Sequence, residues 1–381
     1  MKLSKNAITV LEKRYLMRDV NHRIIETPSG MFRRVAKAIA SIDKKYGEKE
    51  VKKSEEVFYS MMANLEFLPN SPTLMNAGTE IGQLAACFVL PVEDSMVGIF
   101  DALKHMALVH KSGGGTGFAF SNLRPRGDIV KSTLGVASGP VSFMCAFDKA
   151  TEIVKQGGRR RGANMGILHI SHPDIVEFIR AKGEENLLKN FNVSVAVTDE
   201  FMRAVKRDGE HKLINPRNGK TVKTLRAKAL FDLIVEQAWR TGDPGIVFID
   251  EINRRNPTPK VGKIDSTNPC AEMPLLSFES CNLGSINLTK MLAGRNEEVK
   301  IDFDKLRTTV RNAVHFLDNV IDANIYLLPN IEEITKANRK IGLGVMGFAQ
   351  MLIELGIPYD SNEALKTAEK IMEFIEREAI K

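Results

Sequence analysis

Strand-like and helix-like segments alternate through the middle of the chain. Three apolar segments rich in β-branched residues are typical of buried strands: LAACFVLPV (84–92), FNVSVAVTD (191–199) and GIVFID (245–250). Apolar residues recur at helical spacing in three stretches between them: 97–110, 141–155 and 225–239. Parallel strands need a crossover connection, usually a helix, so this order predicts an α/β fold with a parallel sheet.

Residues 1–68 predict a helical region ahead of that sheet. Apolar residues recur at helical spacing in three runs, Ile8–Leu16, Phe32–Ile39 and Val57–Leu65. Thr27-Pro28 separates the first run from the second. A long helix is also expected late in the chain, over Phe303–Leu328, with one apolar face made of Leu306, Val310, Val314, Leu317 and Ile321.

Composition narrows the class of protein. The 381 residues are 43% hydrophobic and 27% charged, as in ordinary globular proteins. The net charge of +7 is scattered among acidic neighbours and comes with no nucleic-acid motif, so mononucleotide phosphates are more plausible partners than nucleic acid. Neither a signal peptide nor an apolar run of membrane-spanning length is present, and four widely spaced cysteines indicate a reducing compartment, so we expect the cytoplasm and no membrane partner.

The stretch Ser266–Leu288 contains two of the four cysteines, Cys270 and Cys281. Asn268 and Glu272 stand two residues to either side of Cys270. In an extended loop alternate side chains point the same way, so the amide, the thiol and the carboxylate would share one face. That grouping is typical of catalysis. The alternative is a buried cysteine in a turn, which is the usual role of a lone cysteine.

Several loops combine glycine with polar side chains. PNSPTLMNAG (69–78) is interpreted as a loop whose Ser71 suits a sugar or phosphate, or as plain surface. The glycines at 113–117 lie between a helix and a strand, the reverse of the order in a dinucleotide fingerprint. QGGRRRGAN (156–164) joins backbone freedom to guanidinium groups, which favours a ligand loop and a solvent-facing charge run about equally.

The remaining cysteines and the histidines do not form a metal site by their spacing. Cys87 is expected on a buried strand, where a thiol is inert unless the fold brings a second one beside it. Cys145 is expected in a helix core. His169 and His172 lack a supporting ligand set, and the residues around His172 are more typical of a helix start, so no metal is predicted.

Seven motifs in order resemble the large chain of ribonucleotide reductases, and the resemblance runs from the N-terminus to about residue 355. They are NSPTLMNAG, AACF, KSGGG, QGGRRRGAN, NPCAE, CNLGSINL and GLGVMGF. The NPC form and the short gap from Cys270 to Cys281 resemble the class II, adenosylcobalamin-dependent branch. The resemblance implies a ten-stranded α/β barrel made of two five-stranded parallel halves, with the catalytic cysteine on a finger loop. Four segments are then expected: a helical region (1–68), a first half-barrel with effector loops (69–265), the finger loop (266–290) and the start of a second half-barrel (291–381).

The resemblance also implies catalytic roles. Cys270 would form the thiyl radical that abstracts the ribose 3′-hydrogen, Glu272 would take the 3′-hydroxyl proton, and Asn268 would orient the substrate. Cys87 and Cys281 would be the redox pair that reduces the 2′ position. Further substrate contacts are implied at Ser71, Ala86 (through its backbone) and Arg161.

An allosteric site for deoxynucleoside triphosphates is implied as well. Its contacts would be Asp94, Lys111, Arg124, Ser138 and Gln156. Because the family forms this site at a dimer interface, a homodimer is expected.

The family's later barrel strands and its C-terminal cysteine pair do not occur in these 381 residues. We therefore expect a truncated chain, half of a split enzyme or an extein-like segment, with a second chain that completes the barrel among its partners. The substrate is expected to be a ribonucleoside di- or triphosphate, and the reductant a thioredoxin-like or other dithiol.

Three other interpretations remain. One is a class I large subunit, whose radical comes from a metal-containing partner protein. Another is a non-catalytic nucleotide-binding protein that uses the glycine and arginine loops as a sensor. A thiol oxidoreductase is disfavoured, because the chain has no C-x-x-C motif.

Overall fold

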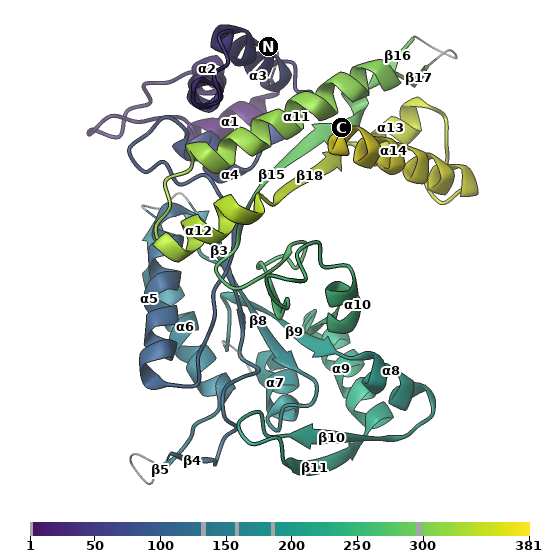
Figure 1. The fold of residues 1–381 in the computed structure, drawn as a ribbon. Helices are drawn as coiled ribbons and strands as arrows, with labels where there is room; N and C mark the ends of the chain where they lie inside the picture. Colours follow the sequence, from purple (N-terminus) through teal and green to yellow (C-terminus); the bar gives the residue numbers. More distant parts are fainter. Residues whose placement is uncertain (1–2, 131–134, 157–159, 184–186, 295–298) are drawn as a thin grey trace. The chain divides into compact units, whose positions relative to one another are not determined.

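The computed structural model describes residues 3–130, 135–156, 160–183, 187–294 and 299–381 (Figure 1). Within them the chain forms two compact units. Unit 1 comprises the chain up to Ala86 together with Cys281–Tyr326 and Thr335–Lys381, and unit 2 comprises Cys87–Ser280 and Leu327–Ile334. Each unit has its own framework of helices and strands, described below in turn.

The N-terminal part of unit 1 is helical, which confirms the prediction for this region. It contains α1 (Lys5–Arg14), α2 (Pro28–Ala40), the 3₁₀ helix η1 (Ser41–Tyr46) and α3 (Val51–Ala63). The Thr27 hydroxyl accepts a hydrogen bond from the Gly30 amide and Pro28 occupies the first turn, so α2 begins as a capped helix should. The predicted apolar run lies on the buried face of α2, which packs against α3.

A three-stranded sheet and a long helix complete the core of unit 1. Strand β15 (Ser280–Asn287) pairs antiparallel with β1 (Phe67–Pro69) and parallel with β18 (Ile341–Met346). The long predicted helix is α11 (Phe303–Ala323), which packs against α2, β18 and α14 (Asn362–Ile380). It ends five residues earlier than the sequence predicted. The remaining elements of unit 1 are η3 (Leu288–Lys290), β16 (Leu292–Ala293), β17 (Lys300–Ile301) and α13 (Phe348–Glu354). Helix α12 (Pro329–Asn338) is divided between the units: its residues up to Ile334 belong to unit 2 and those from Thr335 to unit 1.

The sequence predicted a loop over 69–78, but part of this segment is helical. Ser71–Asn76 form helix α4. The Asn70 side-chain oxygen accepts hydrogen bonds from the Thr73 amide (2.9 Å) and the Thr73 hydroxyl (2.8 Å), and Pro72 stands in the first turn. The same turn-forming residues therefore act here as a helix cap.

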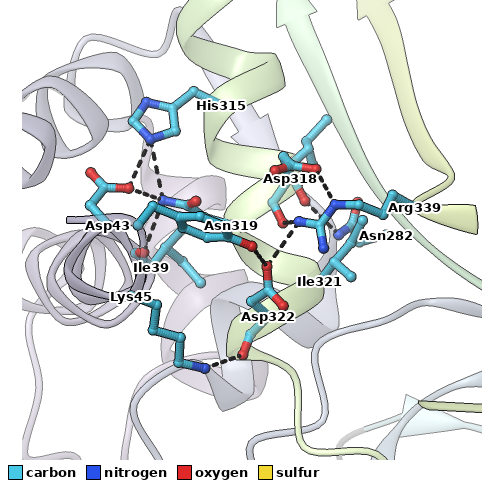
Figure 2. A network of polar contacts seen from close by, with 12 residues as sticks. Ile39, Asp43, Lys45, Asn282, His315, Asp318, Asn319, Ile321, Asp322 and Arg339 are labelled. Atoms are coloured by element: carbon cyan, nitrogen blue, oxygen red, sulfur yellow. Dashed lines mark hydrogen bonds and ion pairs between the residues drawn. The ribbon is translucent and has the colours of Figure 1, made fainter. Parts of the chain in front are cut away.

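Polar side chains tie α11 to the N-terminal helices of unit 1 (Figure 2). The buried carboxylate of Asp43 accepts hydrogen bonds from Asn319 (2.6 Å) and His315 (2.9 Å). Burial alone would raise the pKa of Asp43, but hydrogen bonds from Ser54, Asn319 and His315 outweigh it and hold the pKa below its usual value. Further along α11, Arg339 donates to the Asp318 and Asp322 carboxylates, each at 2.9 Å.

Unit 2 is built on five parallel strands, which confirms the predicted α/β fold and matches the number of strands in one half of the family barrel. The strand order is β2 (Cys87–Val89), β3 (Gly115–Ala119), β8 (Asn164–His169), β9 (Phe191–Val197) and β12 (Gly245–Phe248). The connecting helices are α5 (Met96–Ser112), α6 (Pro140–Ile153), α7 (Ile175–Arg180), α8 (Asp199–Lys206), α9 (Ala227–Thr241) and α10 (Ile249–Arg254), with the 3₁₀ helix η2 (Ala181–Gly183) after α7. Short antiparallel hairpins lie in the connections between these strands and helices. They pair β4 (Ile129–Val130) with β5 (Gly135–Val136), β6 (Lys155–Gln156) with β7 (Arg160–Arg161), and β10 (Glu210–Ile214) with β11 (Thr221–Arg226).

Two details of the unit 2 prediction are wrong. Strand β12 was expected to be buried up to Asp250, but Val247 is its one buried residue and α10 begins at Ile249. The cause is that β12 is the last strand in the order of unit 2 and pairs on one side with β9. Cys145 was expected in a helix core, whereas it is only half-buried on α6.

The hydrogen bonds to the Asp43 carboxylate are expected to stabilise unit 1 in a way that depends on pH. Because the pKa of Asp43 is lowered in the folded state, its carboxylate stabilises the fold above the unfolded value of about 4, and this contribution is lost as the pH falls through the folded pKa. We expect Asp43→Asn to lower the free energy of unfolding by about 1–3 kcal/mol at neutral pH. Urea unfolding between pH 7 and pH 3 measures this, and the difference from wild type should shrink below about pH 4. Asp304→Asn is the matched control, because that aspartate is 88% exposed, on α11 of the same unit. Equal stability of the two variants would contradict the argument.

Candidate active site

The finger loop of unit 2 is a tight hairpin. Strands β13 (Ser266–Thr267) and β14 (Pro274–Leu275) pair antiparallel. The Asn268 amide donates to the Met273 carbonyl (3.2 Å), and the Asn268 side-chain oxygen accepts from the Met273 amide (3.0 Å). Ala271 has a φ of +66°, which an extended chain does not allow. The expectation of an extended loop with three side chains on one face is therefore wrong: Asn268 is buried and Cys270 is exposed.

Glycines of β3 make room for this loop. A Cβ on Gly117 would lie 1.6 Å from the Thr267 carbonyl oxygen, and one on Gly115 would lie 2.8 Å from the Pro269 ring. The Asn192 side chain of β9 donates to the Pro269 carbonyl at 2.7 Å. Two glycines of the cluster at 113–117 thus allow the finger loop to pack closely against β3, so a phosphate ligand is not needed to explain their presence.

Three of the predicted catalytic side chains come together in unit 2. The Asn268 amide nitrogen donates to the Cys87 sulfur at 3.0 Å, and the Cys87 thiol donates toward Glu272 Oε1 at 3.9 Å. Cys87 is buried, as predicted for its strand, while Glu272 is exposed. A thiol, an amide and a carboxylate are therefore in contact, and this group can bind a hydroxyl-bearing ligand and move a proton. Cys270 belongs to the same loop and presents an exposed thiol.

Other predicted residues belong to unit 1. Cys281 is buried at the start of β15, and its thiol donates to the Asn282 carbonyl at 3.1 Å. The Ala86 amide donates to the Cys281 carbonyl (3.1 Å). The Asn70 amide, next to Ser71, donates to the Leu283 carbonyl (2.8 Å). In unit 1, Cys281 is therefore part of the first half of β15, and the segments that contain Ser71 and Ala86 are hydrogen-bonded to it.

Two of the predicted effector contacts also meet in unit 2. The Arg124 guanidinium donates to both carboxylate oxygens of Asp94 at 3.0 Å, and this pair raises the pKa of Arg124. Lys111 is exposed near the end of α5, and Ser138 is exposed ahead of α6, which packs against α5.

The glycine- and arginine-rich loop 156–164 is described only in part. Gln156 lies on β6, which contacts α5, and Arg161 lies on β7, but their side chains fall outside the described part of the structure. Residues 157–159 lie outside the described residues altogether.

A cavity that the sequence interpretation missed lies at the carboxyl ends of β3, β8 and β9. It has a volume of about 370 Å³, and its polar lining residues are Ser121, Asn122, His169, Ser171, His172 and Asp265. Burial lowers the pKa of His169 and His172 and raises that of Asp265, so the imidazoles favour the neutral form. Polar residues directly after the strands were the available signal, because ligands bind at this end of parallel sheets. His172 also bonds the Leu123 carbonyl at 2.9 Å, so part of its role is structural.

In the part of the chain that the structure describes, no group of His, Cys, Asp and Glu side chains is arranged to hold a metal ion. None of the helices in this part combines the length and the apolar character needed to span a membrane.

Comparison with known proteins identifies the family. The model described as "Ribonucleotide reductase, barrel domain" matches residues 85–381, and the model described as "Ribonucleotide reductase, all-alpha domain" matches residues 1–82. A vitamin B12-dependent ribonucleoside-diphosphate reductase of Thermoplasma acidophilum is 51% identical over 100% of this chain and 56% of its own length. A protein of the same name from Mycobacterium tuberculosis is 52% identical over 100% of this chain and 53% of its own.

A more distant relative is the ribonucleoside-diphosphate reductase large subunit of Vaccinia virus, which is 32% identical over 96% of this chain and 50% of its own length. The chain thus spans about half the length of the curated relatives it matches. Both family models match in sequence order and together cover nearly all residues. The chain belongs to the ribonucleotide reductase large-subunit family.

Proposed function

We propose that this chain carries the catalytic core of an enzyme that reduces ribonucleotides to 2′-deoxyribonucleotides. The observation that carries the proposal is the contact of Asn268 and Glu272 with Cys87, beside the exposed Cys270. The three relatives reported above are named as reductases of ribonucleoside diphosphates, which agrees with this chemistry. Those names favour a diphosphate substrate over a triphosphate.

The reaction assigns one step to each side chain. A Cys270 thiyl radical abstracts the 3′-hydrogen of the ribose, and Glu272 takes the proton of the 3′-hydroxyl. The 2′-hydroxyl leaves as water. Cys87 and Cys281 supply two electrons and two protons and become a disulfide, and the 3′-hydrogen is then returned from the Cys270 thiol. A thioredoxin-like or other dithiol reduces that disulfide for the next turnover. Such thiols need a reducing compartment, which favours the cytoplasm.

We propose adenosylcobalamin as the cofactor. The two relatives named above as vitamin B12-dependent are 51% and 52% identical to this chain, whereas the large subunit without B12 in its name is 32% identical. When bound, the cofactor supplies the radical that removes the hydrogen atom from Cys270. The residues fit this role, because Cys270 is exposed and can be reached. Ser121, Asn122 and His169 of the carboxyl-end cavity offer hydroxyl, amide and imidazole groups that would hold its nucleoside part.

Regulation by deoxynucleoside triphosphates in a homodimer is a further part of the proposal. The Asp94–Arg124 pair offers a carboxylate for a sugar and a guanidinium for a phosphate. Exposed apolar side chains on α5 supply a dimer surface: Val97 (74% exposed), Phe100 (52%) and Leu108 (38%) recur at helical spacing on one face.

Substitution of the finger-loop thiol tests the reaction. Because a hydroxyl does not replace a thiol as a radical carrier, we expect Cys270→Ser to lower deoxynucleotide formation by at least about a thousandfold, as removal of a central catalytic group does. Product chromatography in the presence of adenosylcobalamin and a dithiol measures it. Cys145→Ser is the matched control, since that half-buried thiol lies on α6 away from the finger loop, and it should retain activity. Deoxynucleotide formation by Cys270→Ser at the wild-type rate would disprove the mechanism.

Substitution on α5 tests the dimer. A carboxylate at position 100 would be desolvated without a partner in an apolar interface, so we expect Phe100→Glu to shift the protein from dimer to monomer. Sedimentation velocity over a range of protein concentrations gives the dissociation constant. Trp239→Glu changes another exposed aromatic residue (86% exposed, on α9) and should leave the dimer intact. A wild-type chain that sediments only as a monomer would rule out the interface.

A further inference from the structure

We propose that the Tyr15 hydroxyl positions the Ser71 hydroxyl, so that Ser71 donates a hydrogen bond to an acceptor oxygen of the ribonucleotide substrate. The inference rests on the function proposed above. It gives the N-terminal helical region a part in substrate binding, with Tyr15 acting through Ser71 as a positioning residue.

The two hydroxyls are in direct contact. Tyr15 Oη lies 2.8 Å from Ser71 Oγ, although 56 residues separate them in sequence. Both side chains are half-buried, so the contact has access to solvent and to a ligand. Tyr15 itself is held firmly: its amide donates to the Leu11 carbonyl at the end of α1 (2.9 Å), and its ring packs against the core of unit 1.

The chemistry of the pair fixes the direction of the hydrogen bond. A serine hydroxyl has one hydrogen to donate and lone pairs to accept with. A phosphate oxygen or a ribose ring oxygen only accepts, so Ser71 can bind one only if its hydrogen is not already given to Tyr15. A phenol is a stronger hydrogen-bond donor than an aliphatic hydroxyl, so Tyr15 is suited to donate. With Tyr15 as donor, Ser71 Oγ is anchored and its own hydrogen points to the ligand.

The same N-terminal region also holds the far end of α4. The Arg34 guanidinium donates to the carbonyls of Ala77 (2.5 Å) and Leu74 (3.2 Å), where the last turn of this helix leaves its carbonyls open. Glu26 pairs with Arg34 at 2.8 Å, and both side chains are largely buried, with 9% and 13% exposure. A helix of six residues has little stability of its own, so its position comes from these contacts and from Tyr15.

Unit 1 contains a matched pair for comparison. Tyr59 Oη lies 2.7 Å from Ser29 Oγ, an equally short contact between the same two residue types. This pair is exposed on α3 and α2, and Ser29 is not a predicted substrate residue. A purely structural role of tyrosine–serine pairs would make both pairs equivalent in a substrate-binding assay.

The experiment compares Tyr15→Phe, Ser71→Ala and the double variant with Tyr59→Phe in the enzyme loaded with adenosylcobalamin. We expect Tyr15→Phe to raise KM for the ribonucleoside diphosphate about three- to tenfold, the effect of losing one hydrogen bond, with kcat and the melting temperature unchanged. The double variant should be no worse than Ser71→Ala alone, because both substitutions remove the same interaction. Tyr59→Phe should leave KM unchanged.

Calorimetric binding of a ribonucleoside diphosphate to the same variants separates this inference from the proposed function. If wild type binds the nucleotide without turning it over, the proposed function fails, and weaker binding by Tyr15→Phe still supports the inference. An unchanged KM and dissociation constant in Tyr15→Phe, effects that add in the double variant, or an equal effect of Tyr59→Phe would each overturn the inference. Absence of nucleotide binding by folded wild type would overturn both.

Discussion

The arrangement of unit 2 depends on one close approach between two stretches of backbone. The Thr267 carbonyl of the finger loop lies where the Cβ of any other residue at position 117 would be, only 1.6 Å away. Backbone cannot rotate aside as a side chain can, so a side chain on β3 at this point would displace β13 and all that follows it. Thr267 and Asn268 are buried, so the displaced loop would also leave polar groups without partners.

Asn268 connects this packing constraint to the chemistry. Its side-chain oxygen accepts from the Met273 amide and closes the hairpin, while its nitrogen donates to Cys87 on β2. One amide therefore sets both the shape of the loop and its register on the sheet. The tight turn that results directs Cys270 outward and keeps Glu272 near Cys87. A loop that formed without contact to β2 would present the thiol but not the proton acceptor beside the second thiol.

The sequence was sufficient for the parallel sheet of unit 2, because alternating strand and helix periodicities are local signals. It was not sufficient for the finger loop. A positive φ at an alanine, as at Ala271, is rare and has no sequence signature, so alternation was assumed where a turn exists. The contact of Asn268 with Cys87 joins residues 181 positions apart, which no local pattern reveals. Only the resemblance to a known family grouped those two residues beforehand. Helix α4 was missed for the opposite reason: Asn70 and Pro72 are as typical of a helix start as of a loop.

Two thiols of unit 2, those of Cys270 and Cys87, differ in exposure in the way that their proposed roles require. A thiol that exchanges a hydrogen atom with a separate radical source must be reachable, and Cys270 at the tip of the hairpin is exposed. A thiol that supplies reducing electrons should be protected from other oxidants, and Cys87 is 3% exposed and capped by an amide donor. Strand β2 and the hairpin turn produce this difference through packing alone. The glycines of β3 therefore matter to the chemistry although none is proposed to touch the substrate, because they allow the finger loop to place Asn268 and Glu272 against the buried Cys87.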